Sequence, residues 1–85
     1  MPEDLLNVYI ARRKNDLLGC YQALNEGDFS TLEGTGHKLK GNGSTFGYPA
    51  LSTLGARIEK AAARQDTEQI QQALEELSAW LKTFH

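Results

Sequence analysis

The residues best suited to chemistry in this 85-residue chain lie in the segment GTGHKLKGNGSTFG, residues 34–47. It contains His37, with Lys40 three residues later and glycines at positions 34 and 41. A neutral imidazole is a nucleophile near pH 7, and a lysine one helical turn away can attract phosphoryl oxygens. The segment holds five of the chain's eight glycines. Because a glycine inside a helix costs about 0.8–1 kcal/mol relative to alanine, these glycines need a reason.

Helical periodicity predicts that two of these glycines serve packing. At about 100° per residue, one stripe of the helix expected over 28–46 collects its apolar and small residues. This stripe consists of Phe29, Leu32, Gly36, Leu39, Gly43 and Phe46. It is the expected core face, and Gly36 and Gly43 on it would let a neighbouring helix come close.

The other glycines surround the histidine on the opposite side of the same helix. His37 lies about 160° from Leu39, so we expect its ring to be in solvent. Gly34 and Gly41 lie one turn before and one turn after it, where they leave the imidazole accessible to a large partner. Two small polar residues extend the same face, Ser30 and Ser44. This pattern favours an accessible nucleophile over a surface histidine with chance neighbours.

Other chemistries fit this histidine less well. A metal site is not expected, because His85 at the chain end is the only other histidine and Cys20 is the only cysteine. A hydrolytic triad is not expected on a convex helix face without a pocket or an oxyanion hole. The glycines also lack the spacing of an ATP phosphate-binding loop. Nucleophilic chemistry in which a partner protein completes the site remains.

The whole chain predicts an all-α fold in one domain over residues 1–85, an antiparallel up-down-up-down four-helix bundle. Helices are expected over 2–26, 28–46, 49–65 and 67–84. Gly27 and Gly47 are expected to end helices, Pro49 to begin one, and Asp28 and Asp66 to cap two others. The loops between these helices are short, so neighbouring helices must be antiparallel.

Composition limits the function and the location of the protein. The hydrophobic content of 40% and charged content of 24% are ordinary for a globular domain, and the net charge of −2 gives no reason to expect nucleic acid. No apolar run approaches the roughly 18 residues of a membrane span, and the first residues, MPEDLL, are not expected to form a signal peptide. We expect a cytoplasmic protein without membrane insertion, with Cys20 as a buried apolar residue.

The glycine-rich segment resembles the histidine-containing phosphotransfer (HPt) domain of multistep two-component phosphorelays. The family pattern is His-x-Leu-Lys-Gly, then a glycine six residues after that glycine, then an apolar residue four further on. The matching residues are His37, Leu39, Lys40, Gly41, Gly47 and Leu51, and Ile58-Glu59 matches an apolar-Glu pair common in the next helix. Many relatives have alanine just before the histidine, where this chain has Gly36.

The resemblance implies signal transduction through a phosphohistidine. His37 would take a phosphoryl group from an aspartyl phosphate on a response-regulator receiver domain, including that of a hybrid histidine kinase, and pass it to another receiver's aspartate. Lys40 would stabilise the phosphoryl group, and Gly41 would clear space for the receiver. Gly34 and Ser44, which lie on the same face of the helix, are expected to bind the partner as well. The chain would bind no cofactor or metal and would not be an enzyme with its own ATP site. The receiver would hold Mg²⁺ and supply most of the catalysis.

Two alternatives are open to a histidine on an exposed helix. A histidine-kinase dimerisation helix reads His-Glu-x-x-x-Pro, whereas Lys38 follows the histidine here and no proline is near. An HPt-like adaptor could bind partner proteins without being phosphorylated, but it would have no need of His37. Acceptance of an acid-labile phosphoryl group separates a carrier from an adaptor. In either case we expect a monomer.

Overall fold

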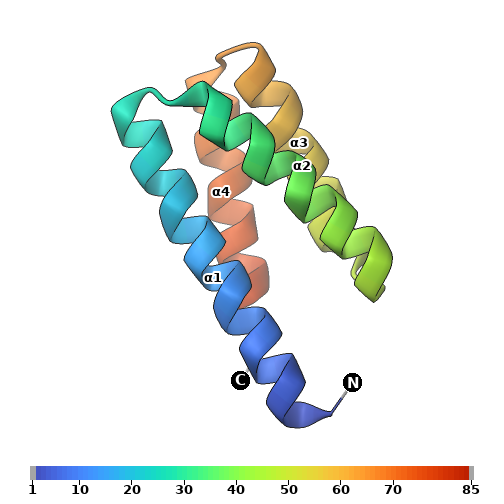
Figure 1. Ribbon diagram of the computed structural model, residues 1–85. Helices are drawn as coiled ribbons and strands as arrows, with labels where there is room; N and C mark the ends of the chain where they lie inside the picture. Colours follow the sequence, from blue (N-terminus) through green and yellow to red (C-terminus); the bar gives the residue numbers. More distant parts are fainter. Residues whose placement is uncertain (1, 85) are drawn as a thin grey trace.

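The computed structural model describes residues 2–84, and Met1 and His85 lie outside them. Its helices are α1 (Glu3–Glu26), α2 (Phe29–Phe46), α3 (Pro49–Ala63) and α4 (Thr67–Leu81). They run alternately up and down (Figure 1), and the described residues contain no β-strand. The predicted antiparallel four-helix bundle is confirmed. The first two helices begin one residue later than predicted, because Pro2 and Asp28 are their N-caps.

The connections between helices are formed by the residues expected there. Gly27 and Gly47 end α1 and α2 in the left-handed conformation, with φ of 70° and 79°. Glycine adopts this conformation without a Cβ clash. Asp28 and Asp66 cap α2 and α4 by accepting hydrogen bonds from backbone N–H groups of the first turn, and Pro49 begins α3. These short turns join each helix to an antiparallel neighbour.

The last two helices end earlier than their sequence pattern predicts. Helix α3 ends at Ala63 rather than 65, because Gln65 takes a left-handed φ of 54° before the cap of α4. Helix α4 ends at Leu81 rather than 84, and the backbone N–H of Phe84 bonds the carbonyl of Leu81 in a tighter turn. The ring of Phe84 still packs, with its centroid 4.9 Å from that of Trp80.

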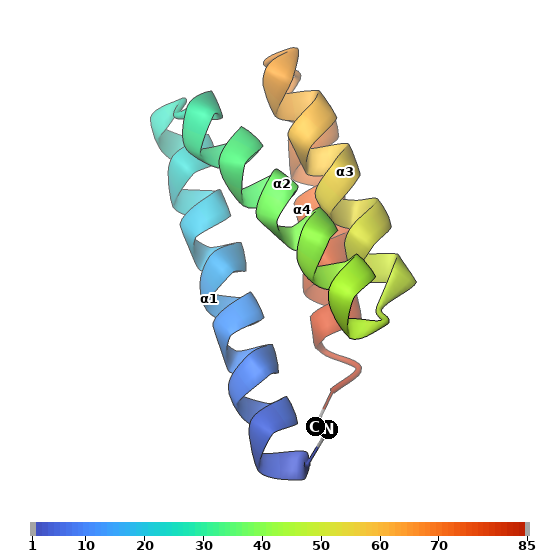
Figure 2. The ribbon, with the colours of Figure 1, turned by 45° about the vertical axis from the view of Figure 1, so that its right-hand side comes forward.

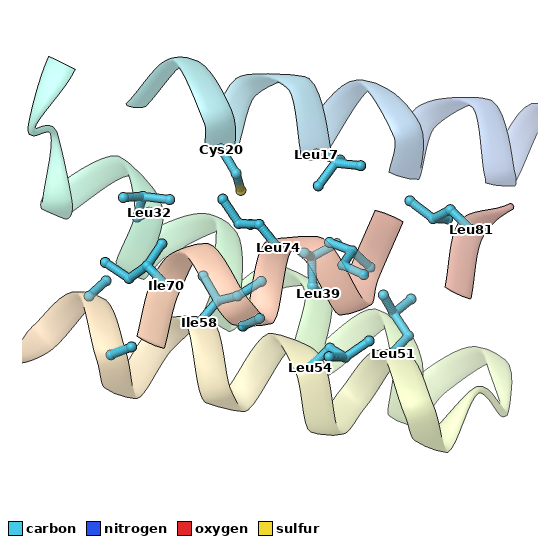
Figure 3. Close-up of a cluster of buried hydrophobic side chains, with 14 of the residues drawn as sticks. Leu17, Cys20, Leu32, Leu39, Leu51, Leu54, Ile58, Ile70, Leu74 and Leu81 are labelled. Carbon is cyan, nitrogen blue, oxygen red and sulfur yellow. The ribbon is translucent and has the colours of Figure 1, made fainter. Parts of the chain in front are cut away.

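Apolar side chains from all four helices meet in one core (Figure 3). Its fully buried aliphatic residues are Leu32, Leu39, Leu51, Ile58, Ile70, Leu74, Leu77 and Leu81. Burying each such side chain contributes about 1.5–3 kcal/mol. Cys20 is 1% exposed, and burial raises the pKa of its thiol to about 11. Cys20 is therefore the buried apolar residue that the sequence predicts.

One residue of the predicted core stripe lies outside the core. Phe46, in the last turn of α2, is 48% exposed, and its ring centroid lies 4.9 Å from that of Tyr9 on α1. Helices α1 and α2 diverge toward this end of the bundle in both views (Figures 1 and 2). Because of this divergence, Phe46 lies outside the core, although it is on the same face of α2 as the buried Leu32 and Leu39.

Helices α2 and α3 approach so closely that three positions admit no side chain. A Cβ on Gly43 would lie 2.2 Å from the backbone nitrogen of Ser52, and a Cβ on Gly36 would lie 2.6 Å from a backbone nitrogen of α3. Gly55 is the third such position, on α3, because a Cβ there would lie 2.3 Å from a backbone nitrogen of α2. The predicted packing role of Gly36 and Gly43 is confirmed, and Gly55 joins them.

Candidate functional site

The histidine of the glycine-rich segment projects into solvent from the middle of α2. The side chain of His37 is 72% exposed, in agreement with its position opposite the apolar stripe. The same helix buries Leu39 completely. One helix therefore supplies both a rigid anchor in the core and an accessible imidazole.

A carboxylate from the neighbouring helix orients this imidazole. The Nδ1 atom of His37 lies 2.8 Å from Oε2 of Glu59 on α3. Since a carboxylate can only accept a hydrogen bond, Nδ1 is the nitrogen that carries the proton. In the neutral ring the lone pair is then on Nε2, which is the nitrogen left available to a partner.

Lys40 shares the same carboxylate. Its Nζ lies 3.7 Å from Oε1 of Glu59, and its side chain is half exposed. Glu59 therefore uses one oxygen for the imidazole and the other for the ammonium group. This arrangement holds a cation close to the imidazole through a shared carboxylate.

The position of Glu59 depends on the close approach of α2 and α3. Gly36 lies directly before the histidine in sequence, and a Cβ there would meet the backbone nitrogen and Cα of Glu59 at 2.6 and 3.0 Å. An alanine at this position would separate the two helices here. Glycine thus allows the carboxylate to reach the ring from the adjacent helix.

The predicted access positions are open. A Cβ on Gly34 or Gly41 would have no neighbouring atom within 4 Å, so packing does not require glycine at either position. Ser44 is exposed, but its hydroxyl lies 3.1 Å from that of Ser52 on α3 and is partly engaged there. Ser30 is exposed in the first turn of α2. The exposed face of α2 thus keeps small side chains on both sides of the histidine.

The second lysine beside the histidine belongs to the contact between α1 and α2. The Nζ atom of Lys38 lies 2.8 Å from Oδ1 of Asp16, and Oδ2 of Asp16 lies 3.0 Å from Nε of Arg13. Arg13 is buried and also donates a hydrogen bond to the side chain of Asn42. Lys38 is therefore held toward α1, whereas Lys40 is held toward α3.

Sequence reasoning placed the histidine, the lysine and the two open glycines, but it gave Glu59 no role. The apolar-Glu pair of the family pattern contains Glu59 and was the available signal. Asp16 and Arg13 were missed as well, because nothing in the spacing of α1 indicates which residues of α2 they face.

The part of the chain that the structure describes contains neither a cluster of metal-binding side chains nor a membrane-spanning helix. Within residues 2–84, no group of three or more histidine, cysteine or acidic side chains could hold a metal ion. None of the described helices has both the length and the apolar character that a membrane crossing requires.

Comparison with known proteins identifies the family. The family model described as "Hpt domain" matches residues 4–83, a range that includes almost all of the four-helix bundle. Searches of curated proteins and of solved structures find no match. The chain therefore belongs to the Hpt domain family, whose members carry phosphoryl groups in phosphorelays and are not themselves kinases.

Proposed function

We propose that His37 is the phosphorylated residue of this Hpt domain. It accepts a phosphoryl group from the aspartyl phosphate of one receiver domain and passes it to the aspartate of another. The observation that carries the proposal is the contact between Nδ1 of His37 and Glu59, at 2.8 Å, on a side chain that is 72% exposed. This contact leaves Nε2 as an oriented nucleophile facing the partner.

The reaction needs no proton transfer at the attacking atom. As Nε2 attacks phosphorus, the N–P bond forms and the bond from phosphorus to the aspartyl oxygen breaks, which releases the receiver's carboxylate. The ring keeps the proton on Nδ1 and becomes positively charged. Glu59 stabilises that charge through the hydrogen bond it already makes, as a carboxylate does for the histidine of a catalytic triad. The return step to a second carboxylate reverses the same bond changes.

Lys40 stabilises the negative charge of the transferred group. Its half-exposed ammonium group is held 3.7 Å from Glu59 and one turn from the histidine. A lysine acts on phosphoryl oxygens as a mobile point charge, so it can turn from the carboxylate to the phosphoryl group as transfer proceeds. Lys40 is thus a stabilising residue and not the nucleophile.

The receiver completes the site. Mg²⁺ bound by the receiver, and not by this chain, would neutralise charge on the phosphoryl group during transfer. The bare surface around Gly34 and Gly41 lets the receiver's aspartate come into line with Nε2. Ser44, one turn beyond Gly41, lies at the edge of this contact.

The first prediction concerns the nucleophile. His37→Gln should fold as the wild type does, because an exposed substitution of similar size changes stability by less than about 0.5 kcal/mol. It should accept no phosphoryl group from a phosphorylated receiver. Mass spectrometry should detect an acid-labile, base-stable gain of one phosphoryl group on the wild type alone. An unlabelled wild type would favour the non-phosphorylated adaptor, and a labelled variant would move the site to another residue.

The second prediction concerns Glu59. Glu59→Gln keeps the size of the side chain but removes the charge that stabilises the protonated ring, so transfer should slow by roughly 10-fold or more. The ¹⁵N NMR shifts of His37 should show a proton on Nδ1 in the wild type and a mixture of tautomers in the variant. Glu76→Gln is the matched control, because Glu76 pairs with Arg57 away from the histidine. Equal transfer rates in all three proteins would contradict this role.

The third prediction separates the two lysines. Lys40→Ala should slow transfer by roughly 10- to 100-fold if Lys40 supplies about 1.4–2.7 kcal/mol to the transition state. Lys38→Ala should transfer normally, because Lys38 is bound to Asp16 on α1. Rapid-quench kinetics with one phosphorylated receiver checks both variants. Loss of activity in Lys38→Ala alone would reverse the assignment.

The fourth prediction concerns access to the histidine. Gly41→Ala should stabilise the bundle by up to about 1 kcal/mol and slow transfer only moderately. Gly41→Leu should also remain folded, since its position is open, but its side chain would keep the receiver away. A displacement of about 1 Å can cost on the order of 100-fold in rate.

The control for this prediction is Gly43→Ala. A Cβ there meets backbone atoms of α3 at 2.2 and 2.7 Å, so this variant should lose about 1–3 kcal/mol or more in thermal unfolding. Normal transfer by Gly41→Leu would refute the access argument. Destabilisation by both Gly41 variants would make Gly41 a packing residue like Gly43.

A further inference from the structure

The beginning of α1 carries an apolar surface that no other helix of the bundle covers. Leu5 is 59% exposed and Val8 is 49% exposed. In both ribbon views the first turns of α1 extend beyond the ends of the other helices (Figures 1 and 2). The exposed side chains of this part of α1 are therefore accessible to a second molecule.

Charges of opposite sign flank this apolar surface. Asp4, Val8 and Arg12 are spaced four residues apart, so their side chains form one ridge along the helix. All three are exposed, and neither Asp4 nor Arg12 forms an ion pair with another residue of the range 2–84. The ridge is acidic at one end, apolar in the middle and basic at the other end.

The charges of such a ridge are complementary to those of a second copy that runs antiparallel to it. When the i±4 ridges of two helices pack side by side, the helices cross at about −50°, which is the commonest packing class. A two-fold axis beside Val8 would then place Asp4 next to the partner subunit's Arg12, and Arg12 next to the partner subunit's Asp4. We propose that the protein forms a weak symmetric dimer through this ridge of α1.

The dimer goes beyond the proposed phosphotransfer and leaves its site free. Tyr9, next to Val8, contacts Phe46 at the end of α2, whereas Asp16 contacts Lys38 next to the histidine. Val8 is therefore displaced along the bundle from His37 by about nine residues, or roughly 14 Å of helix. Each subunit keeps its imidazole accessible. A monomer is expected from the sequence, so the oligomeric state in solution decides between that expectation and this dimer.

The contact is small, so the dimer is concentration-dependent. Stable interfaces bury about 1,600 Å² in total, and a crossing of two helices over about three turns buries less. Sedimentation of the 85-residue chain from about 10 μM to about 1 mM should show a reversible monomer–dimer equilibrium. Val8→Glu should abolish the dimer, because it places two carboxylates together at the two-fold axis. Leu18→Glu is the matched control, since Leu18 is 67% exposed on the same helix but lies off the ridge.

Charge reversal tests the direction of the pairing. Asp4→Lys and Arg12→Glu, made separately, should each weaken the dimer by about tenfold in Kd, because each replaces two attractive pairs by two repulsive ones. The double variant restores both pairs and should return Kd to near the wild-type value. A chain that stays monomeric at 1 mM overturns the proposal. So does a dimer unaffected by Val8→Glu, or a double variant as weak as the single ones. If the wild type is monomeric and Val8→Glu binds a receiver more weakly than the wild type does, the ridge is a receiver surface and not a dimer contact.

Discussion

The backbone contact between α2 and α3 is the constraint on which the candidate site depends. Gly36, Gly43 and Gly55 lie where the two helices are closest, and a Cβ at any of these positions would approach backbone atoms of the other helix within 2.2–2.6 Å. This contact lets the carboxylate of Glu59 reach Nδ1 of His37 across 2.8 Å. A wider separation would leave both side chains in solvent, with no defined tautomer and no defined direction for the ring. The glycines thus influence the chemistry by setting the distance between the two helices.

The two neighbours of α2 are held by different forces. Its contact with α3 depends on close packing of backbone atoms, whereas its contact with α1 includes a partly buried polar cluster of Arg13, Asp16 and Asn42. A buried charge such as that of Arg13 is costly unless it is paired, so this cluster favours one register of α1 against α2. Farther along, α1 and α2 diverge and leave Phe46 half exposed beside Tyr9. The helix that carries the histidine is consequently fixed along one side and more loosely covered along the other.

Much of this arrangement follows from the sequence, because helical periodicity is a local property. The positions of Leu39 and His37 on opposite sides of α2 need only an advance of about 100° per residue. Helix ends were predictable where a glycine, proline or aspartate marks them, but not at Gln65, whose left-handed φ of 54° has no such signal. The partnership of His37 with Glu59 was not predictable from spacing. It depends on how α2 and α3 cross, and the sequence of neither helix indicates their relative register.

The ion pairs on either side of the histidine also affect how a partner is recognised from a distance. Lys38 and Lys40 each lie within 4 Å of a carboxylate, 2.8 Å from Asp16 and 3.7 Å from Glu59, so both lysine charges are largely balanced by their partners. On the proposed function, encounters of the unphosphorylated domain with a receiver would then have rates of about 10⁵–10⁶ M⁻¹s⁻¹ that respond weakly to salt. A phosphoryl group on the ring would upset this balance and create a negative field that reaches about one Debye length, roughly 8 Å at physiological ionic strength. The phosphorylated and unphosphorylated forms would therefore associate with a partner at different rates. A partner could then distinguish the two forms by association rate as well as by affinity.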